Sequence, residues 1–351
     1  MSVAAPLWAG VVGQDQAVAR LEGAAEQPVH AYLFVGPPGS TKREAARAFA
    51  AALLCPERGC GVCRDCRLAL HGGHPDVREV ERTGAAISAE QAGEIIRLAN
   101  LTPVEGRHKV LVLHEFHLLR AEAAARLLKT IEEPPASTVF LVLTDDVPPE
   151  LVTIASRCVR IDFRAVPHNL VVQALVAEGA EHDAAEVAAT AAGGNLERAR
   201  ILAGDAEVAA RREAFHRLPH RLDGSGTVVM AAVDELLGLI DAAAEPLKVR
   251  QAEELRALEA RVEQMGERGA GRRDLTDRHK RELRRHRTDE LKAGLVALAA
   301  GYRDQLAQGT ARDPAEAVAA VGAVHGAIEA LERNPNEHLL LQALFLRLPP
   351  A

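Results

Sequence analysis

The densest group of residues able to do chemistry is a run of four cysteines in the segment CPERGCGVCRDC. Their spacing, C-x4-C-x2-C-x2-C, can place four thiolates around one ion, the donor set that structural Zn²⁺ commonly takes. Free thiols and an iron–sulfur ligand set are the alternatives. We favour structural zinc, because the cluster is a compact insert after a predicted helix and is too small to form its own apolar core. The expected ligands are Cys55, Cys60, Cys63 and Cys66, and the nearby His71 and His74 are expected on the surface.

A second candidate site is the glycine-rich stretch GPPGSTKR, which begins at Gly36. Phosphate-binding loops follow G-x-x-x-x-G-K-[ST]: backbone N–H groups surround the phosphates, the lysine reaches the terminal ones, and the hydroxyl binds Mg²⁺. Gly36, Gly39 and Lys42 match such a loop. Thr41, however, replaces the last glycine, and Arg43 replaces the hydroxyl residue with a side chain that has only hydrogen-bond donors. The loop is therefore degenerate in sequence.

The second Mg²⁺ ligand of such a site is an acidic residue at the end of a later buried strand. The matching apolar run is KVLVL, and His114 follows it in place of an aspartate. Because both positions that hold the same ion are changed, we expect ATP or ADP to be absent or bound without hydrolysis. Two interpretations of the loop stay open: a plain strand-to-helix turn with Lys42 in solvent, or a residual nucleotide pocket.

The elements that must position these residues alternate between short apolar runs and helical patterns. Runs rich in Val, Leu and Ile, typical of parallel strands covered on both faces, occupy 31–35, 76–81, 109–114, 137–144 and 158–163. Helical spacing marks residues 41–54, 88–101 and 117–133 between them. The alternation predicts a doubly wound α/β domain with a parallel sheet.

Beyond residue 163 the strand signals stop, and the rest of the chain is helical in pattern. We expect an α/β domain over 1–163 with a zinc-binding insert at 55–66, and a small domain of three short helices over 164–207. Residues 208–351 are expected to form a third, all-α domain.

One segment of this last part is heavily charged. Residues 266–292 carry ten Lys or Arg against six Asp or Glu, and three glycines at the start predict a flexible hinge before an exposed helix. Its basic side chains could touch DNA phosphates, chiefly Arg272, Arg273, Lys280, Arg284 and Arg285. The interspersed acids and the lack of aromatic residues favour a solvated helix face instead.

The composition of the 351 residues is 48% hydrophobic and 26% charged, ordinary for a globular protein, with only 3% aromatic residues. The formal net charge of -7 argues against a protein that coats polyanions over its whole surface. No apolar run approaches the about 18 residues that a membrane helix needs. The N-terminus lacks the basic start and apolar core of a secretion signal, so we expect a cytoplasmic protein without a membrane partner.

Several stretches together resemble one known family. They are the four-cysteine insert, VVGQDQAV (11–18), HAYLFVGPPG (30–39), LLKTIEEPPASTVFLVLT (127–144) and IASRCVRIDF (154–163). In combination they resemble the delta-prime subunits of the bacterial DNA polymerase III clamp loader, a family of the AAA+ superfamily. The resemblance implies a P-loop-type AAA+ α/β domain, a helical lid domain and an all-α collar domain that oligomerises. It also implies a subunit without its own ATPase activity, which serves as a rigid stator in a ring.

The resemblance also implies partners and roles for single residues. The partners are the gamma/tau ATPase subunits, the delta subunit, the sliding clamp, and primed DNA through the assembled complex. Arg157, in the SRC stretch, matches an arginine finger that points into a neighbouring subunit's ATP; the plainer interpretation is an arginine paired within the chain. Thr144 matches a phosphate-sensing position and is expected to be a relic. Glu197 and Arg198 share the second sensor region, where the family pattern is not clearly matched.

Two rival functions remain beside this interpretation. One is an active gamma/tau-type clamp-loader ATPase, against which Arg43 and His114 count. The other is a zinc-dependent nucleic-acid-binding protein built on an AAA-like scaffold.

Overall fold

The computed structural model describes residues 6–82, 86–205, 207–265, 272–331 and 335–350. The chain forms two compact units, residues 1–203 and residues 204–351. The predicted hinge at 266–271 lies outside the described residues, and the three-domain division stays a prediction. In the part of the chain that the structure describes, no helix combines the length and apolar character needed to cross a membrane.

A five-stranded sheet forms the centre of the first unit, with the strand order β2-β3-β4-β1-β5. All four pairings between neighbours are parallel, as predicted. Val35, the last residue of β1, pairs with Thr144 of β4 and with Asp162 of β5, so these three strands end at one edge of the sheet. The strands are β1 (Ala31–Val35), β2 (Val77–Val80), β3 (Lys109–Leu113), β4 (Thr138–Thr144) and β5 (Val159–Asp162).

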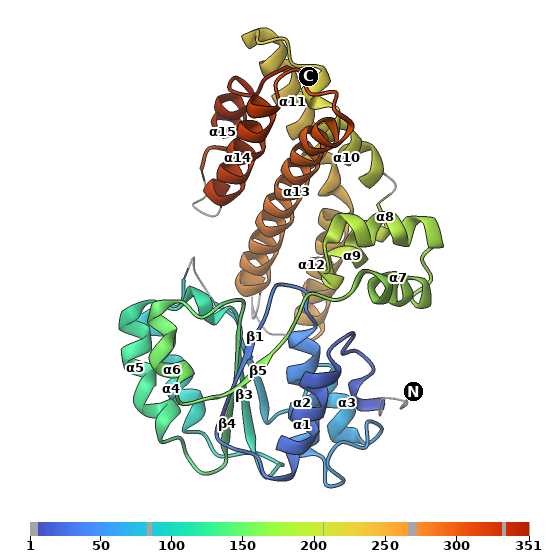
Figure 1. The fold of residues 1–351 in the computed structure, drawn as a ribbon. Coiled ribbons are helices and arrows are strands. Elements are labelled where there is room, and N and C mark those ends of the chain that lie inside the picture. The colour runs from blue at the N-terminus through green and yellow to red at the C-terminus, as the bar shows by residue number, and fades with distance from the viewer. Residues whose placement is uncertain (1–5, 83–85, 206, 266–271, 332–334, 351) are drawn as a thin grey trace. The chain divides into compact units, whose positions relative to one another are not determined.

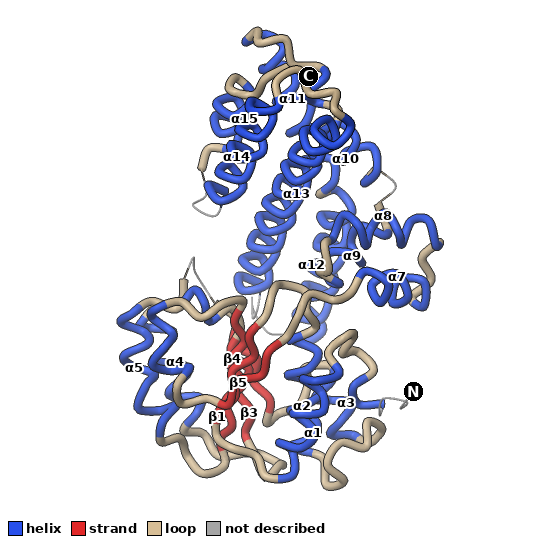
Figure 2. The backbone as a smooth tube through the Cα atoms, viewed as in Figure 1, coloured by secondary structure: helices blue, strands red, loops and turns tan. Residues whose placement is uncertain are grey.

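Helices cover both faces of this sheet, as Figures 1 and 2 show. One face packs against α1 (Asp15–Glu26), α2 (Lys42–Leu54) and α3 (Arg64–Leu70). The other packs against α4 (Ala89–Ala99), α5 (Ala121–Glu132) and α6 (Val152–Ala155). Because both faces are buried, the strands are apolar almost throughout, which explains the continuous runs in the sequence.

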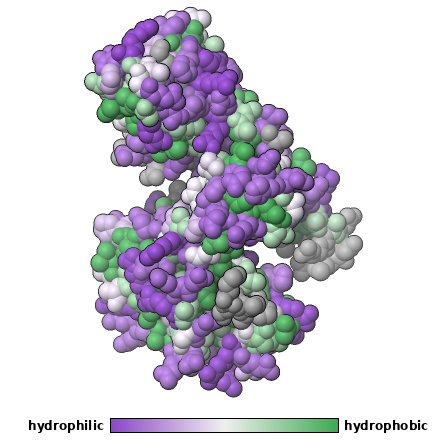
Figure 3. Space-filling view, turned by 45° about the vertical axis from the view of Figure 1, so that its right-hand side comes forward, coloured by the Kyte–Doolittle hydropathy of each residue, from purple (hydrophilic) through white to green (hydrophobic). Residues whose placement is uncertain are grey.

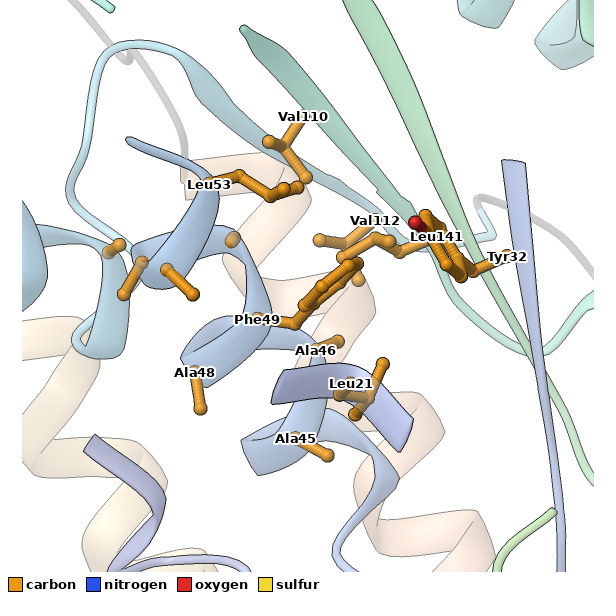
Figure 4. Close-up of a cluster of buried hydrophobic side chains, with 14 of the residues drawn as sticks. Leu21, Tyr32, Ala45, Ala46, Ala48, Phe49, Leu53, Val110, Val112 and Leu141 are labelled. Carbon is orange, nitrogen blue, oxygen red and sulfur yellow. The ribbon is translucent and has the colours of Figure 1, made fainter. Parts of the chain in front are cut away.

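The helix α2 is held tightly against the sheet. Figure 4 shows Phe49 pointing from α2 towards Val112 and Leu141 of the sheet. Its ring meets that of Tyr32 edge-on, with centroids 4.8 Å apart and an interplanar angle of 79°. Both rings are fully buried, and removing such a side chain from a core costs about 3–5 kcal/mol. Packing of the middle of α2 against the sheet therefore also holds both ends of the helix in place.

Three short helices complete the first unit, as the sequence predicts: α7 (His168–Ala177), α8 (His182–Ala192) and α9 (Leu196–Ala203). The chain returns to the sheet domain just before α9. There the backbone N–H of Leu196 donates to the carbonyl of Gly39, with 3.1 Å between the atoms. The start of α9 is thus bonded to the glycine-rich loop.

The second unit is entirely helical in its described part. Its elements are α10 (Val208–His216), α11 (Gly226–Ala243), α12 (Glu245–Met265), α13 (Arg272–Gln308), α14 (Pro314–Leu331) and α15 (Glu337–Phe345). A separate apolar core joins all of these helices except α12, with the fully buried Phe215, Tyr302 and Phe345 among its larger side chains. On the face drawn in Figure 3, hydrophilic residues predominate and apolar ones form smaller areas between them.

Candidate functional site

Two candidate sites lie at opposite ends of α2. The glycine-rich loop leads from β1 into the first turn of this 13-residue helix, and Cys55 follows its last residue. At a rise of 1.5 Å per residue, the two sites are about 20 Å apart.

The two glycines of the loop are each required by close contacts. A Cβ at Gly36 would lie 2.4 Å from the carbonyl oxygen of Phe163, which follows β5. Gly39 has a left-handed backbone (φ +66), and a Cβ there would lie 1.8 Å from Oδ1 of Asn195. The loop therefore has the backbone of a tight strand-to-helix turn, and the chain's own Asn195 packs against it.

Thr41 adopts a conformation that suits the missing glycine. It stands directly before α2 with φ 60 and ψ 22, a left-handed backbone that β-branched residues rarely adopt. The hydroxyls of Ser40 and Thr41 are buried and have no hydrogen-bond partner among the described residues. The left-handed backbone of a residue such as Thr41 costs about 1–3 kcal/mol and persists only where the surrounding structure enforces it.

Lys42 is buried, so the interpretation that places its ammonium group in solvent is wrong. Its Nζ donates to the carbonyl of Gly36, to that of Pro37 at 2.9 Å, and to Oδ1 of Asp145 at 2.9 Å. Asp145 follows β4, so the contact joins the loop to the neighbouring strand's end. The ammonium group is directed at acceptors of its own chain.

Basic side chains occupy both positions where Mg²⁺ ligands would stand. Arg43 pairs with Glu81 and lies 3.8 Å from Oε2 of Glu79. His114 Nε2 lies 3.1 Å from Oε2 of the same Glu79, and Arg47 Nε lies 2.5 Å from its Oε1. Burial raises the pKa of the Glu79 carboxyl, but the bonds from His114 and Arg47 outweigh burial and hold that pKa at about 2. We call these five side chains the Glu79 network.

Sequence reasoning missed two acids and an amide of this site: Glu79, Asp145 and Asn195. Glu79 is the penultimate residue of β2, Asp145 follows β4 and Asn195 precedes α9, so a search for acids at or next to the strand ends would have found the first two. Thr144, the expected relic, donates its hydroxyl to the carbonyl of Asp146. Arg198, in the second sensor region, donates its backbone N–H to Asn195 Oδ1 at 2.9 Å, so the Asn195 side chain caps the start of α9.

Arg157 lies away from this loop. It precedes β5, and β5 runs parallel to β1, so Arg157 lies towards the sheet edge opposite to the loop. Its Nη1 donates to the carbonyl of Thr153 at 2.8 Å, and its Nε lies 3.2 Å from Oε2 of Glu132. The side chain is one-third exposed (33%). Arg157 therefore has partners within the chain and an accessible guanidinium, but it does not reach its own loop.

The four cysteines do come together. All four sulfurs lie within 4.8 Å of one another. Cys55 Sγ lies 3.8 Å from Cys60 Sγ and 3.7 Å from Cys63 Sγ. A tetrahedron of sulfurs at 2.3 Å from Zn²⁺ has edges of about 3.8 Å, so the spacing fits this ion. Two backbone N–H groups donate to the sulfurs, Cys63 to Cys60 and Cys66 to Cys63, each at 3.4 Å.

The expectation for one of the two nearby histidines is wrong. His71 lies at the surface, but His74 is buried. Its Nδ1 accepts the backbone N–H of Asp76 at 3.1 Å, which leaves the proton on Nε2, 3.8 Å from Oδ1 of Asp65. Asp65, His74 and Glu105 lie close enough to hold an ion. Arg64, however, lies 2.6 Å from Glu105 and 3.6 Å from Asp65, so a cation is already present there.

Known proteins that are similar to this chain include subunits of DNA polymerase III. Residues 13–167 match the family described as DNA polymerase III, delta subunit. The tau subunit of Salmonella typhimurium is 33% identical over 248 residues, 67% of this chain and 36% of that protein. The delta' subunit of Pseudomonas aeruginosa is 38% identical over 144 residues, 39% of this chain and 44% of that protein.

A solved structure is also similar, that of a DNA polymerase III gamma subunit-related protein from Thermotoga maritima. The similarity covers 93% of this chain and 97% of that one, with a TM-score of 0.49 and 18% identity. The chain spans 36% of the Salmonella and 39% of the Escherichia coli tau subunits it matches. From its parallel sheet, the family match and the Salmonella and Pseudomonas relatives, the chain belongs to the clamp-loader family of AAA+ proteins.

Proposed function

We propose that this chain is the delta-prime subunit of a DNA polymerase III clamp loader, without ATPase activity of its own. It would help to load the sliding clamp on primed DNA and would supply Arg157 to a neighbouring subunit's ATP. The observation that carries the first part is the Glu79 network, in which Arg43 and His114 stand where oxygen ligands of Mg²⁺ are needed.

The chemistry of the network opposes Mg²⁺ binding. Magnesium prefers oxygen ligands in near-ideal octahedral geometry. The guanidinium of Arg43 offers only donors and a positive charge, and the carboxylate of Glu79 is already bonded to two basic side chains. An ion would have to separate these pairs and leave partly buried basic side chains without their partners, which is unfavourable.

The position of Arg157 supports action on a second chain. A guanidinium is always charged, and its planar fork can stabilise charge that spreads over a transferring phosphoryl group. Because Arg157 lies at the opposite sheet edge from its own loop, any phosphate that it contacts would belong to a neighbour. We propose gamma/tau ATPase subunits as those neighbours, with the delta subunit, sliding clamp and primed DNA as further partners in the cytoplasm.

The test is DNA-stimulated ATP hydrolysis by the reconstituted loader with Arg157→Ala in this chain. Turnover at the affected site should fall by at least tenfold, since arginine fingers contribute about 10³–10⁵. Arg160→Ala is the matched control, because Arg160 is exposed and pairs only with Asp162 among the described residues. Unchanged turnover in an assembled ring would mean that Arg157 is structural.

A second measurement separates the two clamp-loader roles. The isolated chain should show no Mg²⁺-dependent ATP turnover above that of a Lys42→Ala variant, which lacks the phosphate-binding lysine. Turnover that the wild type shows and this variant lacks would favour the active gamma/tau-type ATPase instead.

A further inference from the structure

A small cavity lies between the C-terminal parts of α1 and α2, two helices that pack side by side (Figure 1). We call it the Trp8 cavity. Its walls come from the 3₁₀ turn Pro6–Trp8, from the two helices and from the start of the cysteine insert. Its volume is about 270 Å³, below the range of pockets that hold drug-sized ligands, so it suits a single side chain.

The apolar part of the cavity is built into the core. Leu7 and Trp8 are each only 3% exposed, and both pack with Ala52 of α2 in the core that covers the sheet. A Cβ at Gly59 would lie 2.5 Å from Cδ2 of Leu7, so the insert also closes tightly on the 3₁₀ turn. The cavity is therefore formed before any ligand enters it.

The indole of Trp8 offers a hydrogen bond that the described chain does not use. A tryptophan ring can only donate, through Nε1–H, and a buried one usually finds an acceptor. Trp8 is buried and lines the cavity, yet its indole N–H has no acceptor among the described residues. An acceptor placed in the cavity from outside the chain would supply the missing bond.

Two carboxylates of α1 also line the cavity without partners. Glu22 and Glu26 lie one turn apart and are exposed, and neither has an ion pair or side-chain hydrogen bond in the described part of the chain. Like charges at this spacing repel, and a cation beside them would remove the repulsion. Arg58 lines the cavity as well but pairs with neither acid, so the acids remain available to a ligand.

We propose that the Trp8 cavity binds a lysine or arginine side chain on a segment of a partner protein. The apolar stem of such a side chain would pack on Leu7 and Trp8, and its charged head would reach Glu22 and Glu26. A carbonyl of the same segment would accept the indole N–H. Nucleic acid is disfavoured, because the two carboxylates would repel its phosphates.

The experiment uses the fluorescence of Trp8, which is the only tryptophan of the chain. The full-length chain is titrated with the blocked tripeptide acetyl-Leu-Arg-Leu-amide, which should change the emission saturably. The glutamine counterpart acetyl-Leu-Gln-Leu-amide should bind at least about tenfold more weakly, since it lacks the charge.

Two variants test the residues of the cavity. E22Q/E26Q should weaken binding of the arginine peptide at least about tenfold, because it removes the charged acceptors. The matched control is E90Q/E94Q, the same change at the same spacing on two exposed positions of α4, which should bind within about twofold of the wild type. Ala25→Leu fills the cavity without a change of charge and should abolish the emission change.

Thermal unfolding shows whether each variant is folded. Equal binding of the two peptides, equal losses in the acid variant and its control, or unchanged binding by Ala25→Leu would overturn the proposal. Spermidine that binds as tightly as the arginine peptide would overturn the choice of a protein segment, because it carries no carbonyl for Trp8. None of these measurements involves ATP, so their result is independent of the Arg157→Ala test.

Discussion

The two ends of α2 differ in whether they carry side chains that can bind a metal ion. At the N-terminal end the backbone of a phosphate loop is present, but the side chains that would hold Mg²⁺ are replaced by Arg43 and His114. At the C-terminal end all four thiols are present, with sulfur spacings that fit Zn²⁺. The same rigid helix therefore connects a site without its metal ligands to a site with a complete set.

This difference between the two sites follows from the structural role that each one has besides binding an ion. Gly36 and Gly39 are needed for packing against Phe163 and Asn195, so the loop's backbone serves the fold whether or not a phosphate binds. The Mg²⁺ ligands of the loop can be replaced because the ion pairs of the Glu79 network occupy the same positions. The insert at 55–66 has no such substitute, because a segment this short cannot form an apolar core.

The largest effect is expected from removing the metal ligands. We expect one Zn²⁺ per chain, and Cys63→Ser should abolish stoichiometric binding and loosen residues 55–66 by several kcal/mol, while the sheet stays folded. Metal analysis and hydrogen exchange of the segment measure both results. Cys158→Ser is the control, since this fifth cysteine lies outside the cluster. Iron in place of zinc, or no metal in protein purified without chelators, would contradict the prediction.

The next effect tests the Glu79 network at the other end. His114→Asp removes a donor to Glu79 and places a second carboxylate beside it, so the free energy of unfolding should fall by about 3–5 kcal/mol. His114→Asn, which keeps a neutral donor, should cost less. Urea unfolding compares the two variants, and an aspartate variant as stable as the wild type would show that the network contributes little.

Acid should reveal the same network without any change in the sequence. The pKa of Glu79 lies at about 2 in the folded chain against an ordinary 4.5, so its contribution is fully present above about pH 5. That contribution, about 3 kcal/mol, is lost as the pH falls from about 5 to 2. Glu79→Gln should flatten this part of the stability–pH curve, while Glu22→Gln, at an exposed position of α1, should retain it. Curves of equal slope for both variants would count against the network.

The smallest effect concerns the loop's backbone. Thr41→Gly should raise the free energy of unfolding by about 0.5–1 kcal/mol, because glycine relieves the left-handed strain at φ 60 and removes a buried hydroxyl without a partner in the described chain. Thr41→Ala keeps a Cβ in this conformation and should gain less. A glycine variant that is less stable than the alanine variant would contradict the prediction that the backbone is strained at residue 41. Thermal unfolding at several scan rates can resolve the difference.

Much of the sheet could be predicted from the sequence, because short continuous apolar runs that alternate with helical patterns are typical of parallel strands covered on both faces. The run at 31–35 matches β1 fully, and the other four strands agree within one residue at each end. The helix predicted over 117–133 begins later, at Ala121. Before it, Glu115 takes a left-handed backbone at φ 53 and Phe116–Leu118 forms a 3₁₀ turn. Local backbone geometry of this kind leaves no period in the sequence.

The sequence by itself determined the types of side chain at both ends of α2: four thiols in metal-binding spacing, and a loop whose Mg²⁺ positions hold Arg43 and His114. Only the tertiary structure decided how those side chains are satisfied. Lys42 turns to Asp145, and His114 and Arg43 meet at Glu79, because parallel strands far apart in the sequence end at one edge of the sheet. Spacing along a chain sets which donors are available, whereas long-range pairing sets which acceptors they meet.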